Sequence, residues 1–349
     1  MNFDSRDFSF RDVDKTVVIA EVGVNHNGDV QIAKKMIEAA AKAGAEIVKF
    51  QAFRSEKEIS RFAAKTPYQR ETTTDKGSQL EMCKALELKA SDLVELKNYC
   101  GKLNVPFLCA AFDFDSVDLL VDQLKVETIK VASSEVTNIP FLHYIGSKKK
   151  GVILSTGAST LPEVGLAIEA LQQSGCPELV LFHCVSSYPA PHAEVNLRCM
   201  TTLKNSFGLP VGFSDHTIGT ASAIAAAALG ACAIEKHFTL DRTMVGPDHR
   251  ASVEPHELAE MVSSIKIANL SLGSPFKQPA PCELQNLALI RKSLVAARNL
   301  RKGVKLTRDM IEIKRPRGGI EPSDLDKVLG RTLNKDIDED MFLTWKDLK

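Results

Sequence analysis

The stretch TVVIAEVGVNHNGDVQIAKKMIEAAAKAGAEIVKFQ, residues 16–51, contains one complete strand–helix–strand unit. β-Branched residues near its two ends predict strands over 16–21 and 46–51. The segment between them has a helix-capping aspartate, three apolar residues on one helical face and a terminating glycine: Asp29, Ala33, Ile37, Ala40 and Gly44. Such units are typical of proteins built around a parallel sheet.

The same alternation of strand-like and helical segments continues along the chain. We expect eight strands, at residues 16–21, 46–51, 105–110, 128–132, 151–155, 178–183, 209–213 and 231–236. Eight units within about 270 residues fit a (β/α)8 TIM barrel, although an open doubly wound sheet gives a similar pattern. Polar residues at the strand ends favour the barrel, because a barrel brings all eight ends to one mouth. They are Glu21, Lys49, Gln51, Asp113, Lys130, Ser133, Ser155, His183, Ser214, His216, Glu235 and His237.

The composition and periodicity of the sequence change after residue 272. GSPFKQPAP, which begins at Gly273, has three prolines and no periodicity, so we expect a barrel domain over 1–272 and a linker over 273–290. The remaining residues, 291–349, predict a small second domain with a basic first part. A domain of about 60 residues is marginally stable alone, so we expect it to dock on the barrel or on a second chain.

The composition limits the classes of function. Lys and Arg total 44 and Asp and Glu total 44, so net charge gives no case for nucleic acid or an anionic membrane as partner. Residues 1–15 contain no apolar targeting segment, and no stretch reaches the roughly 18 apolar residues of a membrane span. The eight cysteines are scattered without a CxxC pair, which indicates a reducing compartment. We therefore expect a cytoplasmic protein.

Several of the polar strand ends could bind an anion. Period-two alternation places Lys49 and Gln51 on one side of a strand, and a buried lysine needs a partner. A ligand phosphate or carboxylate is one candidate, and a salt bridge to Glu21 is the alternative. The segments KVASSEVTN, from Lys130, and LSTG, from Leu154, add hydroxyl and backbone donors suited to an oxyanion.

Two histidines follow neighbouring predicted strands, His216 in GFSDHTIG and His237 in EKHF. Two imidazoles, waters and a chelating ligand would form an open site for Mn²⁺, Fe²⁺ or Zn²⁺ that could act as a Lewis acid. Their spacing is no metal motif, so hydrogen-bonded core histidines or a general base are the alternatives.

Eight motifs together resemble those of the sialic acid synthases in order and approximate spacing. They are AEVGVNHNGD, VKFQAF, KVASSEVTN, LSTGAS, HCVSSYPAP, GFSDHTIG, EKHFTLDRTMVGPDHRAS and IKRPRGGI. The resemblance implies a metal-dependent barrel followed by an antifreeze-like (SAF, β-clip) domain. It also implies condensation of phosphoenolpyruvate with N-acetylmannosamine and water to give N-acetylneuraminate and phosphate.

The resemblance further implies roles for individual residues. His216 and His237 resemble the metal ligands, with Mn expected and Mg or Co as alternatives. The residues that match the phosphoenolpyruvate pocket are Lys49, Lys130, Ser133, Ser155, Ser186 and Ser214. Those that match the sugar and proton-transfer positions are Glu21, Gln51, Glu135, Tyr188 and Asp248, with Glu21 and Glu135 as alternative catalytic carboxylates. Arg315 matches an arginine that reaches the partner subunit's sugar site, which implies a domain-swapped homodimer.

Other functions remain in view at this stage. Within the family, a legionaminic acid synthase would use 2,4-diacetamido-2,4,6-trideoxymannose, and a phosphorylated sugar acceptor is a further alternative. GPDHRAS disfavours a pseudaminic acid synthase. From another reaction class, Lys49 or Lys130 could form a Schiff base in an aldolase or lyase. A non-enzymatic ligand-binding or ice-binding module would leave the polar strand ends unexplained.

Overall fold

The computed structural model describes residues 15–73 and 77–349. Residues 1–14, which belong to the opening segment with no expected targeting sequence, lie outside the described residues. The chain divides into two compact units between Gly273 and Ser274. Residues 273–290, expected as a linker, include two short helices, α12 (Pro281–Leu284) and α13 (Leu287–Ile290).

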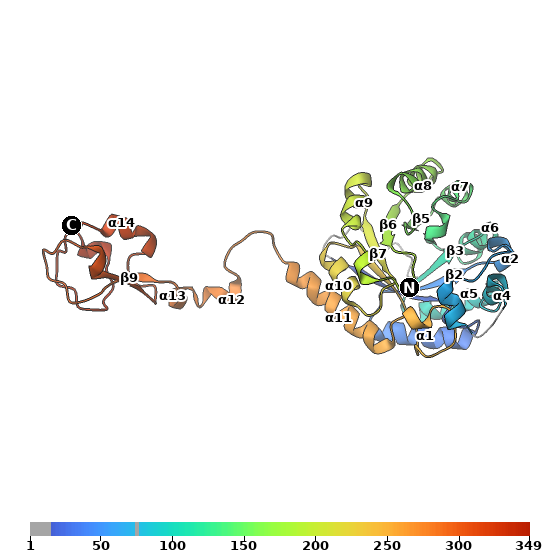
Figure 1. Cartoon of the computed structure of the whole chain (residues 1–349), viewed down its shortest axis with the longest axis horizontal. Coiled ribbons are helices and arrows are strands. Elements are labelled where there is room, and N and C mark those ends of the chain that lie inside the picture. Colours follow the sequence, from blue (N-terminus) through green and yellow to red (C-terminus); the bar gives the residue numbers. More distant parts are fainter. Residues whose placement is uncertain (1–14, 74–76) are drawn as a thin grey trace. The chain divides into compact units, whose positions relative to one another are not determined.

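The first unit is a closed barrel of eight parallel strands in sequential order (Figure 1), which confirms the predicted fold. The strands are β1 (Val17–Gly23), β2 (Ile47–Ala52), β3 (Phe107–Ala111), β4 (Thr128–Val131), β5 (Gly151–Ser155), β6 (Leu179–Cys184), β7 (Val211–Asp215) and β8 (Ala233–His237). Each pairs in parallel with the next, and β8 pairs with β1 to close the barrel. All eight carboxyl ends therefore meet at one mouth.

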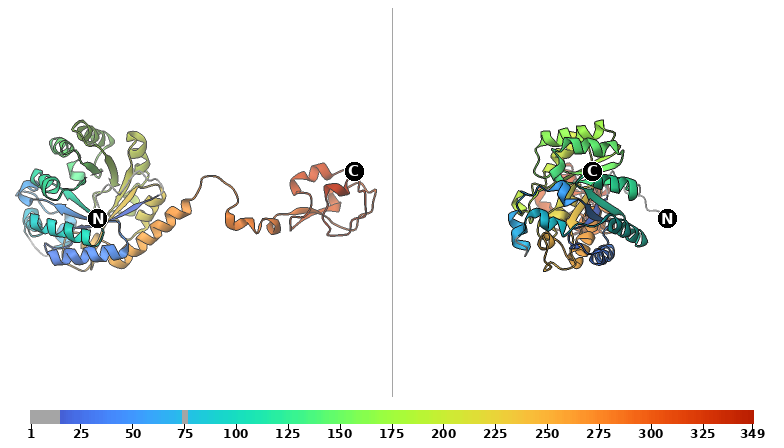
Figure 2. Two further views of the ribbon diagram at one scale, coloured as in Figure 1. Left: turned by 180° about the vertical axis from the view of Figure 1, so that it is seen from behind. Right: turned by 90° about the vertical axis from the view of Figure 1, so that its right-hand side faces the viewer.

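Helices surround the strands, as the two further views show (Figure 2). The longer ones are α1 (Val30–Ala43), α5 (Ala90–Lys102), α7 (Ile139–Ser147), α8 (Leu161–Gln173), α9 (Cys199–Phe207), α10 (Ala221–Ala228) and α11 (Pro255–Leu272). Shorter helices and turns are α2 (Ser55–Glu58), α3 (Pro67–Thr72), α4 (Gln79–Lys84), α6 (Phe114–Asp118), η2 (Leu119–Gln123), η3 (Ser133–Glu135), η4 (His192–Glu194) and η5 (His249–Ala251). Among the residues that the structure describes, no helix is long and apolar enough to cross a membrane.

The first helix follows the features of its sequence. Asp29 caps α1 by accepting hydrogen bonds from the Gln31 and Ile32 amides. Gly44 ends the helix in the left-handed region, with φ of 87°, where a side chain would be strained. The predicted apolar face is buried against the barrel.

The inside of the barrel is divided into an apolar floor and a polar mouth. Apolar side chains of β1, β2, β3, β5, β6 and β8, most of them near the amino ends of the strands, form the floor, which includes Ile19 and Ile47. Two residues further along the same strands, Glu21 and Lys49 take the inward positions. The mouth is thus the place where the barrel presents polar groups.

The second unit is small and has its own core. An antiparallel pair, β9 (Ser293–Ala296) and β10 (Ile311–Lys314), accompanies four short helical turns: η6 (Arg308–Met310), η7 (Pro322–Asp324), α14 (Leu325–Val328) and η8 (Trp345–Asp347). Its core buries apolar side chains that include Leu294, Leu306, Val328 and Leu343. This core lets residues 291–349 form a compact unit despite their short strands.

Candidate active site

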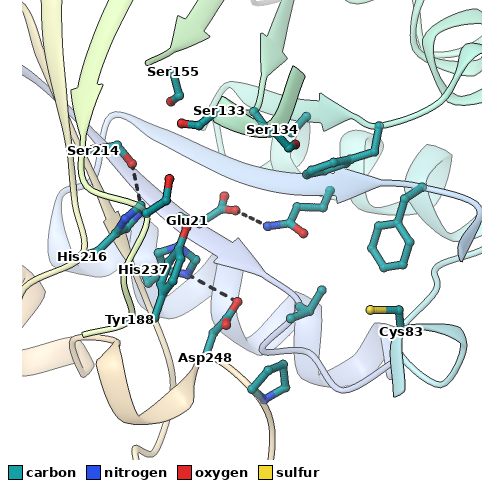
Figure 3. Close-up of a pocket in the computed structure, with 18 of the residues that line it drawn as sticks. Glu21, Cys83, Ser133, Ser134, Ser155, Tyr188, Ser214, His216, His237 and Asp248 are labelled. Carbon is teal, nitrogen blue, oxygen red and sulfur yellow. Dashed lines mark hydrogen bonds and ion pairs between the residues drawn. The ribbon is translucent and has the colours of Figure 1, made fainter. Parts of the chain in front are cut away.

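A cavity of about 310 Å³ lies at the barrel mouth. It brings together most of the candidate residues from the sequence (Figure 3), which come from every strand end except that of β3. These are Glu21, Lys49, Gln51, Lys130, Ser133, Ser155, Ser186, Tyr188, Ser214, His216, His237 and Asp248. The convergence expected of a barrel is therefore observed for residues far apart in sequence.

Among the candidate residues of the barrel, Glu135 does not line this cavity. The Glu135 carboxylate instead accepts hydrogen bonds from Ser134 Oγ at 2.9 Å and Asn138 Nδ2 at 2.7 Å. Arg315 belongs to the second unit, where its side chain is exposed. Of the two carboxylates proposed for catalysis, Glu21 is the one in the cavity.

Two further strand-end residues also lie elsewhere, against the expectation that they point into the mouth. Asp113 caps α6 by accepting from the Ser116 amide at 2.8 Å. His183 packs on Phe213 and its Nε2 lies 2.7 Å from the Val195 carbonyl oxygen. Both side chains therefore have structural partners outside the cavity.

The lining of the cavity includes a buried carboxylate that lies between two lysines. Glu235 lies 2.8 Å from Lys49 Nζ and 3.7 Å from Lys130 Nζ, and Ser214 Oγ donates to it at 2.9 Å. Lys49 also lies 3.5 Å from Glu21. The salt bridge left open by the sequence is thus present, but its shorter partner is Glu235, which sequence reasoning did not include among the site residues.

The charges of this cluster follow from burial and mutual attraction. Burial alone would raise the pKa of Glu235, but Lys130 and Lys49 outweigh it and hold that pKa well below its usual range. Burial would lower the pKa of Lys49, and Glu21 and Glu235 outweigh it in the opposite direction. For Lys130 burial prevails and lowers the pKa to about 8. Lys49 and Lys130 thus share the ionised carboxylate of Glu235. An anionic ligand that entered the cavity would be a second negative group beside these two lysines.

Hydroxyl groups and a glycine surround the lysines. Lys130 Nζ donates to Ser155 Oγ, and the Gly157 amide donates to Ser133 Oγ at 2.9 Å. A Cβ atom at Gly157 would fall 2.4 Å from Ser186 Oγ, so only glycine permits this approach. Ser133, Ser155 and Ser186 are thereby gathered on the side of the cavity formed after β4, β5 and β6.

Glu21 has the properties of a proton acceptor near neutral pH. It is 1% exposed, and its Oε1 accepts a hydrogen bond from Gln51 Nε2 at 2.9 Å (Figure 3). Burial raises the pKa of Glu21 to about 7, despite the opposing charge of Lys49. Its Oε2 is buried without a hydrogen-bond partner. This oxygen faces Lys49 Nζ at 3.5 Å and could still accept a hydrogen bond from a ligand.

The two candidate metal-binding histidines lie side by side at the mouth. Their ring centroids are 5.4 Å apart, and Tyr188 stacks on His216 at 4.1 Å (Figure 3). His216 Nδ1 lies 2.7 Å from the Val185 carbonyl oxygen and so donates to it, which leaves Nε2 with a lone pair. His237 Nδ1 is buried without a hydrogen-bond partner, 3.7 Å from Asp248.

Both imidazoles are held neutral, the form that coordinates a metal. Burial lowers the pKa of His216 to about 4. The pKa of His237 is also lowered well below its usual value, by burial and by the neighbouring His216 and Lys49. In the described part of the chain, no group of three or more His, Cys, Asp or Glu side chains is arranged to hold a metal. A metal ion bound by this pair would therefore need further ligands from water or substrate.

The outer wall of the cavity was not foreseen from the sequence. Residues between β2 and α5 supply much of it, including Phe53, Tyr68, Met82 and Cys83. Tyr68 contacts Tyr188, with ring centroids 5.4 Å apart. This segment has no helical or strand periodicity that would predict which side chains face inward. Glu235 was expected at the mouth as a polar strand end, and its place two residues before His237 on the same strand face could have marked it as a site residue.

A barrel with this mouth and a separate C-terminal unit agrees with the comparisons with known proteins. The NeuB family model matches residues 36–277, and the SAF domain model matches residues 291–349. N,N'-diacetyllegionaminic acid synthase from Campylobacter jejuni is 45% identical over 94% of this chain and 99% of its own length. The enzyme of the same name from Legionella pneumophila is 41% identical over 95% of this chain and 94% of its own.

A solved structure gives the same picture. The crystal structure of N-acetylneuraminic acid (sialic acid) synthetase from Leptospira borgpetersenii is 34% identical, with a TM-score of 0.70 over 78% of this chain and 90% of that chain. The fold and the relatives together define a class, the sugar acid synthases with a barrel and a C-terminal SAF domain. Within it, this chain belongs to the NeuB family. The resemblance to the sialic acid synthases is thereby confirmed.

Proposed function

We propose that this protein condenses phosphoenolpyruvate with 2,4-diacetamido-2,4,6-trideoxymannose and water, giving a legionaminic acid and phosphate. The observation that carries the reaction type is the single cavity that holds two lysines, a buried carboxylate and two neutral imidazoles. The choice of sugar is supported by the two diacetyllegionaminic acid synthases. It replaces N-acetylmannosamine, which the sequence motifs first suggested, as the preferred acceptor.

Phosphoenolpyruvate would occupy the side of the cavity that gathers the cations and hydroxyls. Its phosphate and carboxylate need donors that replace their hydration, and Lys49, Lys130, Ser133, Ser155 and Ser186 provide them. Glu235 then keeps the lysines in place between turnovers, since it is bonded to both. Ala110 lines the same cavity and has no hydroxyl to donate. Backbone amides would therefore complete the binding of the phosphoenolpyruvate carboxylate.

The open-chain sugar would lie on the opposite side, beside the imidazoles, Gln51, Tyr188 and Asp248. The enol carbon of phosphoenolpyruvate attacks the sugar aldehyde, water adds to the resulting cation, and phosphate leaves with its bridging oxygen. Glu21, which is ionised above pH 7, would take the proton of that water. Gln51 holds the carboxylate in place through its hydrogen bond to Oε1.

His216 and His237 would hold a divalent cation, with Mn²⁺ expected and Mg²⁺ or Co²⁺ as alternatives. The bound cation supplies Lewis acidity toward the aldehyde oxygen. The chain's own contribution is to keep both rings neutral and oriented, through burial and through the bond from His216 Nδ1 to Val185.

A panel of acceptors tests the proposal. Phosphate release would be followed with phosphoenolpyruvate, Mn²⁺ and, in separate reactions, the diacetamido sugar, N-acetylmannosamine and its 6-phosphate. We expect the highest kcat/KM with the diacetamido sugar and loss of turnover after chelation. Preferential use of N-acetylmannosamine would instead identify an N-acetylneuraminate synthase, the second candidate, which the Leptospira structure supports.

The same panel separates a Schiff-base enzyme from the proposed one. Lys130, with its pKa lowered to about 8, is the better nucleophile of the two lysines. Its ammonium is nevertheless bonded to Ser155 and paired with Glu235. We expect borohydride to trap no adduct with pyruvate or with the sugar. A trapped adduct at Lys130 together with activity in EDTA would support the aldolase.

We also propose a cytoplasmic, domain-swapped homodimer. The cytoplasmic location is supported by eight cysteines that are all free thiols, as in reducing compartments. The dimer is supported by the match of Arg315 to the arginine that related synthases contribute across subunits.

A further inference from the structure

A buried ion pair lies behind the two candidate metal ligands. Asp215 and Lys236 directly precede His216 and His237 in the chain, and both are 0% exposed. Lys236 Nζ lies 2.8 Å from Asp215 Oδ2, and the register of β7 and β8 places the two residues opposite each other. Since side chains alternate along a strand, this pair points toward the helices while the histidines point into the cavity.

The pair also holds the turn on which His216 is carried. Lys236 Nζ donates to the Thr217 carbonyl oxygen at 2.6 Å, and the Thr217 amide donates to Asp215 Oδ1 at 2.9 Å. Thr217 is itself fully buried. The backbone amide and carbonyl of Thr217 are therefore both hydrogen-bonded to side chains of this pair. The pair thus links β8, which carries His237, to the turn that carries His216.

Other side chains also contact the two rings: Tyr188 lies 4.1 Å from His216 and 5.6 Å from His237 between ring centroids, and Ser214 Oγ lies 3.3 Å from His216 Nε2. His216 has its bond to Val185 on the neighbouring loop, and His237 Nδ1 has no hydrogen-bond partner. Beside these contacts, the position of His237 relative to His216 depends on the paired backbones of β7 and β8, which carry the two histidines. The Asp215–Lys236 contact is the side-chain ion pair that joins these two backbones beside the rings.

We propose that Asp215 and Lys236 are positioning residues that fix the distance between the His216 and His237 rings and thereby set the affinity of the site for a divalent cation. The inference rests on the proposed function for the cation. It goes beyond it by assigning a task to two residues that touch neither substrate nor the cavity. A pair that served only the stability of the fold would not affect metal affinity when replaced, because exchanging a buried ion pair for neutral residues often leaves stability unchanged.

The test uses the full-length protein with three changes: Lys236→Met, the double change Asp215→Asn with Lys236→Met, and Ile265→Ala as control. The double variant removes both charges, so it stays foldable if the single variant leaves an unpaired buried carboxylate. Ile265 is buried on α11 and takes no part in the pair, so its truncation provides a general loss of stability. Mn²⁺ binding to the protein without substrates is measured by calorimetry, and phosphoenolpyruvate binding is measured in parallel.

We expect the double variant to bind Mn²⁺ about 10- to 100-fold more weakly than the wild type, as for other residues that orient metal ligands. The affinity of the double variant for phosphoenolpyruvate should equal that of the wild type. The Ile265→Ala control should bind Mn²⁺ with wild-type affinity. Wild-type affinity for Mn²⁺ in a folded double variant would overturn the inference.

If the wild type itself binds no Mn²⁺, the metal part of the proposed function fails. The positioning role of Asp215 and Lys236 is then tested on its own, by the positions of the two imidazole rings. Crystal structures of the wild type and the double variant would then be compared. Displaced imidazoles would support the positioning role, and unmoved imidazoles would refute it.

Discussion

At Glu21, burial raises the carboxyl pKa while Lys49 lowers it, and burial prevails at about 7. A base with this pKa is active when ionised, so we expect kcat/KM to rise with pH up to a plateau above about 7. Glu21→Gln should abolish this limb and lower kcat by about 10²- to 10⁴-fold. A pH–rate profile of both proteins with saturating Mn²⁺ provides the measurement. A rate that instead falls through pH 7 would make Glu21 an acid that donates to the sugar oxygen.

The same residue should reduce stability as the pH rises from acidic to neutral values. Because the folded-state pKa lies above the ordinary value of 4.5, the folded protein holds this proton more tightly than the unfolded chain. Stability is therefore lost as pH rises from about 4.5 to 7. We expect Glu21→Gln to be more stable than the wild type by on the order of 2 kcal/mol at pH 8 and nearly equal to it at pH 5. Urea unfolding at the two pH values measures this, and an equal difference at both would contradict the burial argument.

At the scale of elements, the loop after β5 is shaped by one glycine. Gly157→Ala would bring a methyl group 2.4 Å from Ser186 Oγ and 2.8 Å from Cys184 Sγ. We expect kcat/KM for phosphoenolpyruvate to fall about 10- to 100-fold while the fold is kept, since small displacements in a site have effects of this size. Steady-state kinetics with each substrate varied in turn measures it.

Gly101 on α5 supplies the matched control for that substitution. A Cβ atom at this position meets nothing within 4 Å. Gly101→Ala should leave both KM values and kcat unchanged. A similar loss in both alanine variants would mean that the effect at Gly157 is general and not a property of the cavity.

The elements also show what could be predicted from sequence. Period-two alternation predicted that Lys49 and Gln51 lie on one side of their strand, and both line the cavity, because strand geometry alone fixes the side on which a residue lies. It did not place Glu135, which sits in the short turn η3 after β4, where no period holds. The outer wall escaped prediction for the same reason, since α2, α3 and α4 are only four to six residues long.

At the scale of the whole molecule, eight strand and helix units together with polar residues at the strand ends predicted the barrel, and the change of composition near residue 273 predicted the domain boundary. The eight expected strands overlap the eight observed ones, because buried β-branched runs leave few other choices. The partners of individual charges could not be predicted in this way. Glu235 lies between Lys49 and Lys130 only because closure of the barrel brings β2, β4 and β8 around one interior.

The proposed domain swap gives a prediction for the complete dimer. A chain with His216→Ala and a chain with Arg315→Ala should each be nearly inactive. After unfolding and refolding an equal mixture, half of the dimers would be mixed and each would hold one intact site. We therefore expect about a quarter of wild-type activity from random pairing of a symmetric dimer. Activity no higher than that of the separate variants, in a mixture shown to contain heterodimers, would exclude the swap.

The most direct test of the proposed reaction follows one oxygen atom. Phosphoenolpyruvate labelled with ¹⁸O at the bridging position is incubated with the protein, Mn²⁺ and the diacetamido sugar, and the released phosphate is examined by ³¹P NMR. Condensation as proposed predicts that the phosphate carries the label and that its release requires the sugar. Unlabelled phosphate, or release that is the same without sugar, would contradict it.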